Sequence, residues 1–166
     1  MYCCCRTKWC RDDDICKGVP PREAGVIHFV NADLIAQGLS PLRPELASVA
    51  AGRLLLDELD RLAETRADFS FESTLSGVAY VGRLKTWEAS GYDIKIVYLK
   101  LSSSRLALRR IAARVKQGGH TVPENDVVRR FERSWKNFVT LYRPLADEWM
   151  ILDNSGDTPV KLSGEP

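Results

Sequence analysis

The sequence predicts an α/β protein with a mainly parallel sheet that helices cover on both faces. Apolar runs of strand length alternate with longer amphipathic stretches from Val26 onward, and this alternation is typical of βαβ units. Polar residues follow directly after each apolar run. In open sheets of this class the ligand binds beyond the carboxyl ends of the strands. We therefore expect the functional residues at that edge of the sheet.

Four short runs predict the strands in chain order. "VIHFV" is β-branched and aromatic, "DFSFES" comes next, "YDIKIVYLKL" is the longest and "EWMILDNS" is the last. Such runs, bounded by glycine or polar residues, favour buried strands. The predicted strands cover residues 26–30, 68–73, 92–101 and 148–155.

Stretches with apolar residues at helical spacing lie between these strands. Ser40-Pro41 precedes the first stretch and Gly91 closes the second. Gly118-Gly119 ends the third, and Pro123 begins the fourth. Residues of these types mark helix starts and ends. The predicted helices cover residues 42–66, 78–90, 103–117 and 123–146.

Length and composition indicate one globular domain. The chain has 166 residues, of which 45% are hydrophobic and 28% are charged, and its net charge is +2. These values are ordinary for a domain with its own core, and the charge alone does not indicate nucleic-acid binding. No run has the length of a membrane span, and no secretory signal is recognisable. We expect a cytoplasmic protein with no membrane partner, with a domain over 26–155, an irregular segment over 1–25 and a tail over 156–166.

All five cysteines lie in the opening segment, at positions 3, 4, 5, 10 and 16. Three adjacent cysteines do not easily face one tetrahedral ion, and Cys10 and Cys16 complete no C-x-x-C pair. Structural zinc sites are normally built from paired ligands with short spacers. The spacing therefore argues against a metal site.

Polar side chains at the ends of the predicted strands form the first candidate site. Asp33 follows "FVNA", and Glu72 ends "FSFE". Two carboxylates at the mouths of parallel strands suit a general base together with a magnesium or hydroxyl contact. The competing interpretation for both residues is helix capping.

An arginine-rich stretch around Gly118-Gly119 forms the second candidate site. It holds Arg109, Arg110, Arg114, Lys116, His120, Arg129 and Arg130. A helix pair of this kind can close over phosphates as a lid, because guanidinium groups bind phosphate oxygens in pairs. One alternative is a solvated helix face, and another is a nucleic-acid patch. The aromatic residues of the fourth helix fall at helical spacing and indicate core instead, which disfavours nucleic acid.

The segments "FVNADLIAQGLSP", "FSFESTLSG" and "RVKQGGHTVPENDVVRRF" resemble the zeta-toxin-like P-loop kinase family. The resemblance covers roughly residues 20–155 and implies a three-layer, P-loop kinase-like fold. Characterised members phosphorylate a sugar hydroxyl of UDP-N-acetylglucosamine with ATP and Mg²⁺. The resemblance also implies a sugar-nucleotide substrate and an antitoxin protein as a possible partner.

The same resemblance assigns roles to individual residues. Asp33 matches the catalytic base, and Arg114 matches a phosphate-binding arginine with a catalytic role. Glu72 and Thr74 match residues that hold the sugar nucleotide. The remaining candidates are Asn31 at the substrate, His120, Arg129 and Arg130 at the lid, and Asn154 at the nucleotide. His120 stands where some members carry a second lid arginine, and a neutral imidazole is a poorer phosphate ligand than a guanidinium.

The family pattern breaks at the phosphate loop. A P-loop kinase needs an apolar strand followed by G-x-x-x-x-G-K-[ST], and residues 1–25 contain neither. Read one base later, the codons of "RTKWCRDDDIC" permit GPNGAGTTTFA, and Trp9-Cys10 forces the central glycine. That string resembles a phosphate loop but carries threonine where the lysine belongs. We expect the first strand and the phosphate loop to be absent or frame-shifted. The strands "DFSFES" and "YDIKIVYLKL" would then lack their shared neighbour, and the sequence leaves two outcomes open: these strands close up, or residues 1–18 fill the gap.

The sequence therefore predicts an ATP-dependent kinase of the zeta-toxin type with weak or absent catalysis. One alternative is a remnant that binds nucleotides or a partner without turnover. The other is a nucleic-acid binder that uses the arginine-rich hairpin, whose affinity would fall steeply with salt.

Overall fold

The computed structural model describes residues 2–6, 28–116 and 122–165, and for residues 2–6 it describes the backbone alone. The described strands form one six-stranded sheet in the order β2-β3-β1-β4-β5-β6. Pairing is parallel between β2 and β3 and between β4 and β5, and these four strands share one direction. The strands are β1 (Tyr2–Arg6), β2 (His28–Val30), β3 (Phe69–Glu72), β4 (Asp93–Lys100), β5 (Glu148–Asp153) and β6 (Val160–Glu165). The predicted α/β class and the mainly parallel direction of the sheet are confirmed.

Part of the segment expected to be irregular is a strand. Tyr2–Arg6 form β1 and lie between β3 and β4, antiparallel to both, with Cys3 opposite Phe71 and Ile96. The backbone N–H and C=O groups of two central strands need partners, and β1 supplies them. Its last residue, Arg6, lies opposite Asp93 at the amino end of β4. The remainder of the opening segment, residues 7–27, lies outside the described residues.

The expected C-terminal tail also contributes a strand. β6 pairs antiparallel with β5, and Gly164 lies opposite Met150. A Cβ atom at Gly164 would lie 2.7 Å from the carbonyl oxygen of Trp149, so this close approach requires glycine. The last predicted strand is therefore followed by an antiparallel edge strand, which the polar composition of the tail did not indicate.

The helices agree with the predicted stretches, with three differences. Residues 32–39 form a helix that is not among the predicted elements, the predicted helix over 42–66 begins with a 3-10 turn over Pro44–Ala47, and the predicted helix over 123–146 is divided. After α5 the chain continues as a π-helix over Phe138–Tyr142 and a short 3-10 turn over Arg143–Leu145, because Pro144 cannot continue a regular helix. The described helices are α1 (Ala32–Leu39), η2 (Pro44–Ala47), α2 (Ser48–Glu64), α3 (Val81–Ala89), α4 (Ser104–Lys116) and α5 (Glu124–Asn137). No helix in the described ranges is both long and apolar enough to cross a membrane.

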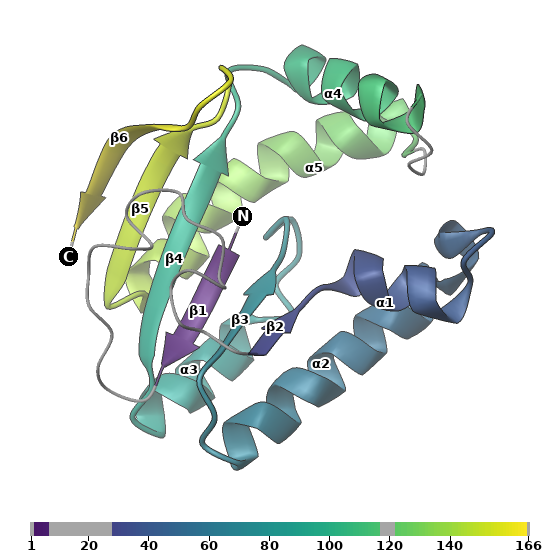
Figure 1. The fold of residues 1–166 in the computed structure, drawn as a ribbon. Helices are drawn as coiled ribbons and strands as arrows, with labels where there is room; N and C mark the ends of the chain where they lie inside the picture. The colour runs from purple at the N-terminus through teal and green to yellow at the C-terminus, as the bar shows by residue number, and fades with distance from the viewer. Residues whose placement is uncertain (1, 7–27, 117–121, 166) are drawn as a thin grey trace.

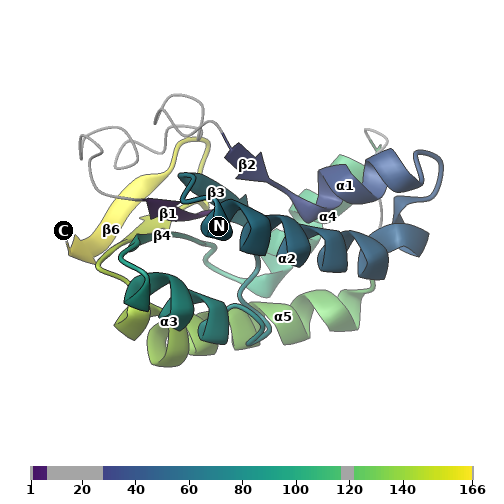
Figure 2. The same ribbon diagram turned by 90° about the horizontal axis from the view of Figure 1, so that it is seen from below.

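One face of the sheet carries the main core. Figure 2 shows α3 and α5 on this face. Phe69 and Phe71 of β3 are fully buried there, and Trp87 of α3 meets Phe69 edge-on with ring centroids 5.1 Å apart. Edge-to-face aromatic pairs add to the stabilisation from apolar burial. A smaller cluster of Val97, Met150 and Leu152 forms a separate buried group.

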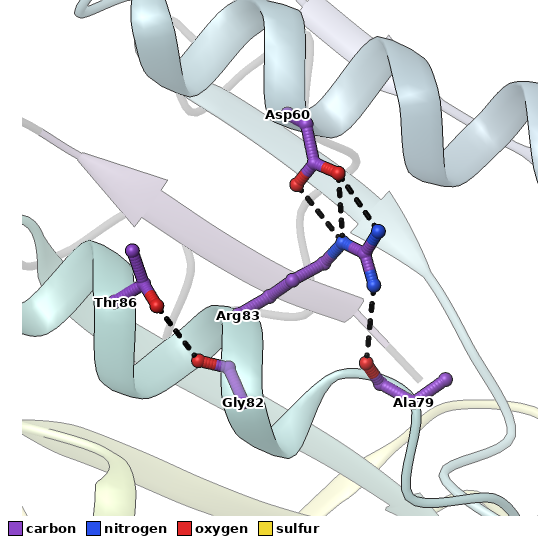
Figure 3. A network of polar contacts seen from close by, with 5 residues as sticks. All are labelled: Asp60, Ala79, Gly82, Arg83 and Thr86. Atoms are coloured by element: carbon purple, nitrogen blue, oxygen red, sulfur yellow. Dashed lines mark hydrogen bonds and ion pairs between the residues drawn. The ribbon is translucent and has the colours of Figure 1, made fainter.

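An ion pair between Arg83 and Asp60 connects α3 to α2. Arg83 donates through Nε and Nη2 to the carboxylate of Asp60, with the shortest contact at 2.7 Å, and Nη1 reaches the carbonyl of Ala79 at 3.4 Å (Figure 3). The hydrogen bond to Asp60 raises the pKa of Arg83 above its usual value. This paired contact joins the first turn of α3 to α2.

Candidate functional site

A cavity of about 870 Å³ opens at the carboxyl edge of the sheet. In Figure 1, α4 and α5 lie on one side of this edge, and α1 and α2 lie on the other. The charged residues that line the cavity are Asp33, Glu72, Lys100, Arg114, Arg130 and Glu132. This is the edge at which the sequence predicts the functional residues, and two predicted clusters far apart in the sequence meet there.

The first group, Asn31, Asp33, Glu72 and Thr74, is called the carboxylate side. Asn31 caps α1, because its Oδ1 accepts hydrogen bonds from the backbone N–H groups of Asp33 and Leu34 at 2.8 and 3.1 Å. Its Nδ2 donates to Glu72 Oε2 at 2.9 Å. One side chain thus joins the start of α1 to the end of β3.

This geometry removes the capping interpretation for both carboxylates. Asn31 is the cap of α1, and Asp33 lies in the first turn, where the helix dipole stabilises negative charge. Glu72 accepts from Asn31, and α3 begins at Val81 without a side-chain cap. The carboxylate of Asp33 makes no hydrogen bond within the described ranges and faces the cavity.

The loop between β3 and α3 holds Thr74 in a constrained position. Thr74 Oγ1 lies 2.9 Å from Ser76 Oγ, and the buried Leu75 has a positive φ of 49°. Backbone strain of this kind persists only where neighbouring contacts determine the conformation. Asn137 Nδ2 donates to the carbonyl of Leu75 at 2.9 Å, and Tyr142 Oη donates to that of Gly77 at 2.6 Å. The end of α5 and the π-helix after it therefore anchor the loop.

The second group, Lys100, Arg114 and Arg130, is called the cationic side. Lys100 ends β4, Arg114 lies in the last turn of α4, and Arg130 lies on α5. Lys100 Nζ lies 4.3 Å from the ring centroid of Trp135, a cation–π contact. In residues 28–116 and 122–164 the structure gives none of the three cations an ion pair.

Buried aromatic residues support the cationic side. Tyr98 Oη lies 3.0 Å from Ser134 Oγ, and the Tyr98 ring packs at 4.5 Å from that of Phe138. Burial raises the pKa of Tyr98 above its usual value, and the hydrogen bond with Ser134 opposes this effect in part. The phenol is therefore neutral at physiological pH and acts as a hydrogen-bonding group.

Some predicted site residues lie elsewhere. Arg129 points its guanidinium at Asp126, at 2.6 Å, and does not line the cavity. Asn154 follows β5, where its backbone N–H donates to the carbonyl of Lys100 at 2.8 Å, and it does not line the cavity either. On one helical turn, adjacent residues such as Arg129 and Arg130 face different directions, so only one of the pair reaches the site. His120 lies outside the described residues.

Lys100 and Glu132 line the cavity but are absent from the predicted site. Lys100 is the second-to-last residue of the longest predicted strand, and its place near the carboxyl end of that strand is the signal that could have indicated it. Glu132 follows Arg130 on the same helix and carried no signal of its own. In the described ranges no three His, Cys, Asp or Glu side chains gather to hold a metal ion. Mg²⁺ is commonly held by one or two carboxylates together with substrate phosphates, and Asp33 and Glu72 fit that role.

Comparisons with known proteins identify a family for most of the chain. Residues 40–160 match the family described as Zeta toxin, so Glu72, Thr74, Arg114 and Arg130 lie within the match. An uncharacterised protein of Haemophilus influenzae (strain ATCC 51907 / DSM 11121 / KW20 / Rd) is 34% identical over 102 residues, which cover 61% of this chain and 73% of that protein. No solved structure matches the chain significantly. The family match supports a kinase-like, nucleotide-binding function. The chain belongs to the zeta toxin family.

Proposed function

We propose that the cavity binds a small sugar-nucleotide-like molecule whose hydroxyl is the acceptor in an ATP-dependent phosphoryl transfer, and that transfer is impaired in this chain. The observation that carries the proposal is the meeting of the carboxylate side and the cationic side in one cavity. A hydroxyl acceptor needs a base and hydrogen-bond acceptors, whereas phosphates need cations.

Each side has a defined task in this proposal. The carboxylate of Asp33 takes the proton of the acceptor hydroxyl, the freed oxygen attacks the γ-phosphorus of ATP, and ADP leaves. Glu72 and Thr74 hold the remaining hydroxyls of the sugar nucleotide. Arg114 and Arg130 neutralise the charge on the transferring group, since guanidinium groups stabilise phosphoryl transfer. Mg²⁺ bound at the carboxylates would neutralise phosphate charge further.

The impairment follows from the opening segment. The whole sequence contains no G-x-x-x-x-G-K-[ST]. A phosphate loop normally follows the central strand at the carboxyl edge. Here β1 runs the other way, so its last residue, Arg6, lies opposite Asp93, at the amino end of β4. The reversed strand favours a second candidate function, in which the site binds its ligands without turnover.

A transfer assay with radiolabelled ATP, Mg²⁺ and UDP-N-acetylglucosamine tests the proposal, run beside calorimetric titration with the sugar nucleotide alone. We expect measurable binding of the sugar nucleotide and transfer no faster than that of the Asp33→Ala variant. Turnover above that variant at saturating ATP would contradict the impairment. A folded protein that does not bind the sugar nucleotide would contradict the acceptor assignment.

A further inference from the structure

Lys100 lines the cavity, and the proposed function gives it no task. It is the last residue of β4, and β4 pairs with β1 on one side and β5 on the other. Its side chain lines the same cavity as Arg114 and Arg130. The ammonium group is half-buried over the Trp135 ring and makes no ion pair within residues 28–116 and 122–164. A lysine directed into a ligand cavity without a carboxylate partner is available to bind an anion.

Lys100 lies close to the place where a P-loop kinase carries the lysine of its phosphate loop, which this sequence lacks. In P-loop kinases a lysine after the central strand neutralises the β- and γ-phosphates, and no such motif exists in this sequence. β3 and β4 both flank the central strand β1 and run toward the cavity, and Lys100 is the residue at the carboxyl end of β4. The cation thus comes from the strand beside the usual one.

We propose that Lys100, together with Arg114 and Arg130, binds the phosphates of a nucleoside triphosphate in place of the lysine of the missing phosphate loop. This inference rests on the proposed function, because it places the donor phosphates in the same cavity. A charge-assisted hydrogen bond to phosphate is stronger than a half-exposed cation–π contact. The ammonium therefore leaves the Trp135 ring when the phosphates bind.

Two carboxylates near Lys100, those of Glu132 and Asp153, bear on how tightly the site binds an anion. Glu132 lines the cavity and opposes anion binding. Asp153 lies opposite Lys100 in the sheet, and hydrogen bonds from Ser155, with a smaller contribution from Lys100, lower the pKa of Asp153. The Asp153 carboxylate accepts the backbone N–H of Ser155 at 2.8 Å, and among the described side chains no ion pair joins it to Lys100.

The test is titration of the full chain with ATP and, separately, with inorganic tripolyphosphate and UDP-N-acetylglucosamine. The variants are Lys100→Met, which keeps the apolar stem on Trp135, Lys100→Arg, which keeps the charge, and Lys136→Met. Lys136 is exposed on α5, does not line the cavity and controls for the loss of one charge. Thermal unfolding of each variant establishes that it is folded.

We expect Lys100→Met to weaken ATP and tripolyphosphate binding about ten-fold or more. Lys100→Arg and Lys136→Met should stay within about two-fold of the wild type, and sugar-nucleotide binding should change little in all three. Tryptophan fluorescence should also change when ATP binds. This change should vanish in Trp135→Phe, which separates Trp135 from the other three tryptophans.

The inference alone fails if Lys100→Met binds ATP as tightly as Lys136→Met while Arg114→Ala binds it weakly. It also fails if all three Lys variants weaken ATP binding equally, since a general charge effect would then suffice. If the folded wild type binds neither triphosphate nor sugar nucleotide, the proposed function and this inference both fail.

Discussion

The two sides of the cavity differ in how they are held before any ligand arrives. On the carboxylate side, hydrogen bonds join the site residues to one another and to the scaffold, as Asn31 does with Glu72 at 2.9 Å and Tyr142 with the carbonyl of Gly77 at 2.6 Å. On the cationic side, Arg114 and Arg130 are exposed and make no ion pair in the described ranges. Hydrogen bonds therefore hold Asn31, Glu72 and Thr74, while the Asp33 carboxylate makes none in the described ranges. The cationic side presents charges that form no ion pair in that part of the chain.

This difference matches the two tasks of the proposed function. An acceptor hydroxyl must be placed accurately, and accurate placement requires side chains that are held in advance. Phosphate groups bring enough charge to order flexible guanidinium side chains as they bind. The carboxylate side therefore acts as a preformed acceptor site, and the cationic side is completed by its ligand.

The largest expected effect is on phosphate binding. The double variant Arg114→Ala/Arg130→Ala removes two charge-assisted contacts, so triphosphate affinity should fall by about 100-fold or more. The matched control is Arg105→Ala/Arg133→Ala, which removes two exposed arginines from the same two helices but outside the cavity. Calorimetric titration gives both affinities. Equal losses in the two double variants would show that the effect is one of overall charge.

The second effect is on the acceptor. Glu72→Gln removes the charge of a carboxylate that Asn31 holds in place. Sugar-nucleotide affinity should fall by about ten-fold or more, since hydrogen bonds to charged groups contribute about 1.5–3 kcal/mol. Glu64→Gln, at the exposed end of α2, serves as the control. Triphosphate affinity should change little in Glu72→Gln. An equal loss of affinity for triphosphate and for sugar nucleotide would contradict separate tasks for the two sides.

A pair of tyrosine variants separates stability from site geometry. Tyr142 Oη donates to the carbonyl of Gly77 beside the cavity, and Tyr92 Oη donates to that of Ala67 at 3.0 Å, away from it. Each Tyr→Phe variant should lower the free energy of unfolding by about 1 kcal/mol. Tyr142→Phe alone should also weaken sugar-nucleotide binding. Denaturant titration and calorimetry measure the two effects, and equal binding losses would contradict the anchoring role of Tyr142.

The smallest expected effect distinguishes adjacent arginines. The sequence predicts Arg129 at the lid, whereas the structure pairs it with Asp126 at 2.6 Å. Arg129→Ala should change triphosphate affinity less than about two-fold, because an exposed ion pair contributes about 0–1 kcal/mol and does not touch the ligand. Arg130→Ala should have the clearly larger effect. A larger loss of triphosphate affinity in Arg129→Ala than in Arg130→Ala would show that Arg129 contacts the phosphates instead.

The elements that sequence periodicity predicts well are those whose partners are local or whose burial is complete. "YDIKIVYLKL" and "SSRLALRRIAARVKQ" correspond closely to β4 and α4. The strand β1 was left open as one of two outcomes, because "YCCCR" shows no alternating strand pattern and its pairing is set by two strands far along the chain. Tertiary context overrides local propensity in such cases.

The site shows the same division. Asp33, Glu72 and Arg114 were predicted because each lies near a strand end or in a motif, and all three line the cavity. The direction of each side chain was not predictable, as Arg129 and Arg130 show. Asn31 was predicted as a substrate contact, but its bridging of α1 and Glu72 depends on a contact between residues 41 positions apart. Lys100 was not predicted, because it was counted as part of the strand "YDIKIVYLKL" and not as a residue at the strand end.

Amide hydrogen exchange, measured without ligand, with UDP-N-acetylglucosamine and with ATP, tests the difference between the two sides most directly. We expect the loop over 73–80 to be protected already without ligand and to gain little. The end of α4 and the start of α5 should gain protection when ATP is added. Exchange in the 73–80 loop as fast as in an unfolded peptide, or no change in α4 and α5 at saturating ATP, would contradict a preformed acceptor site facing a cationic side that its ligand completes.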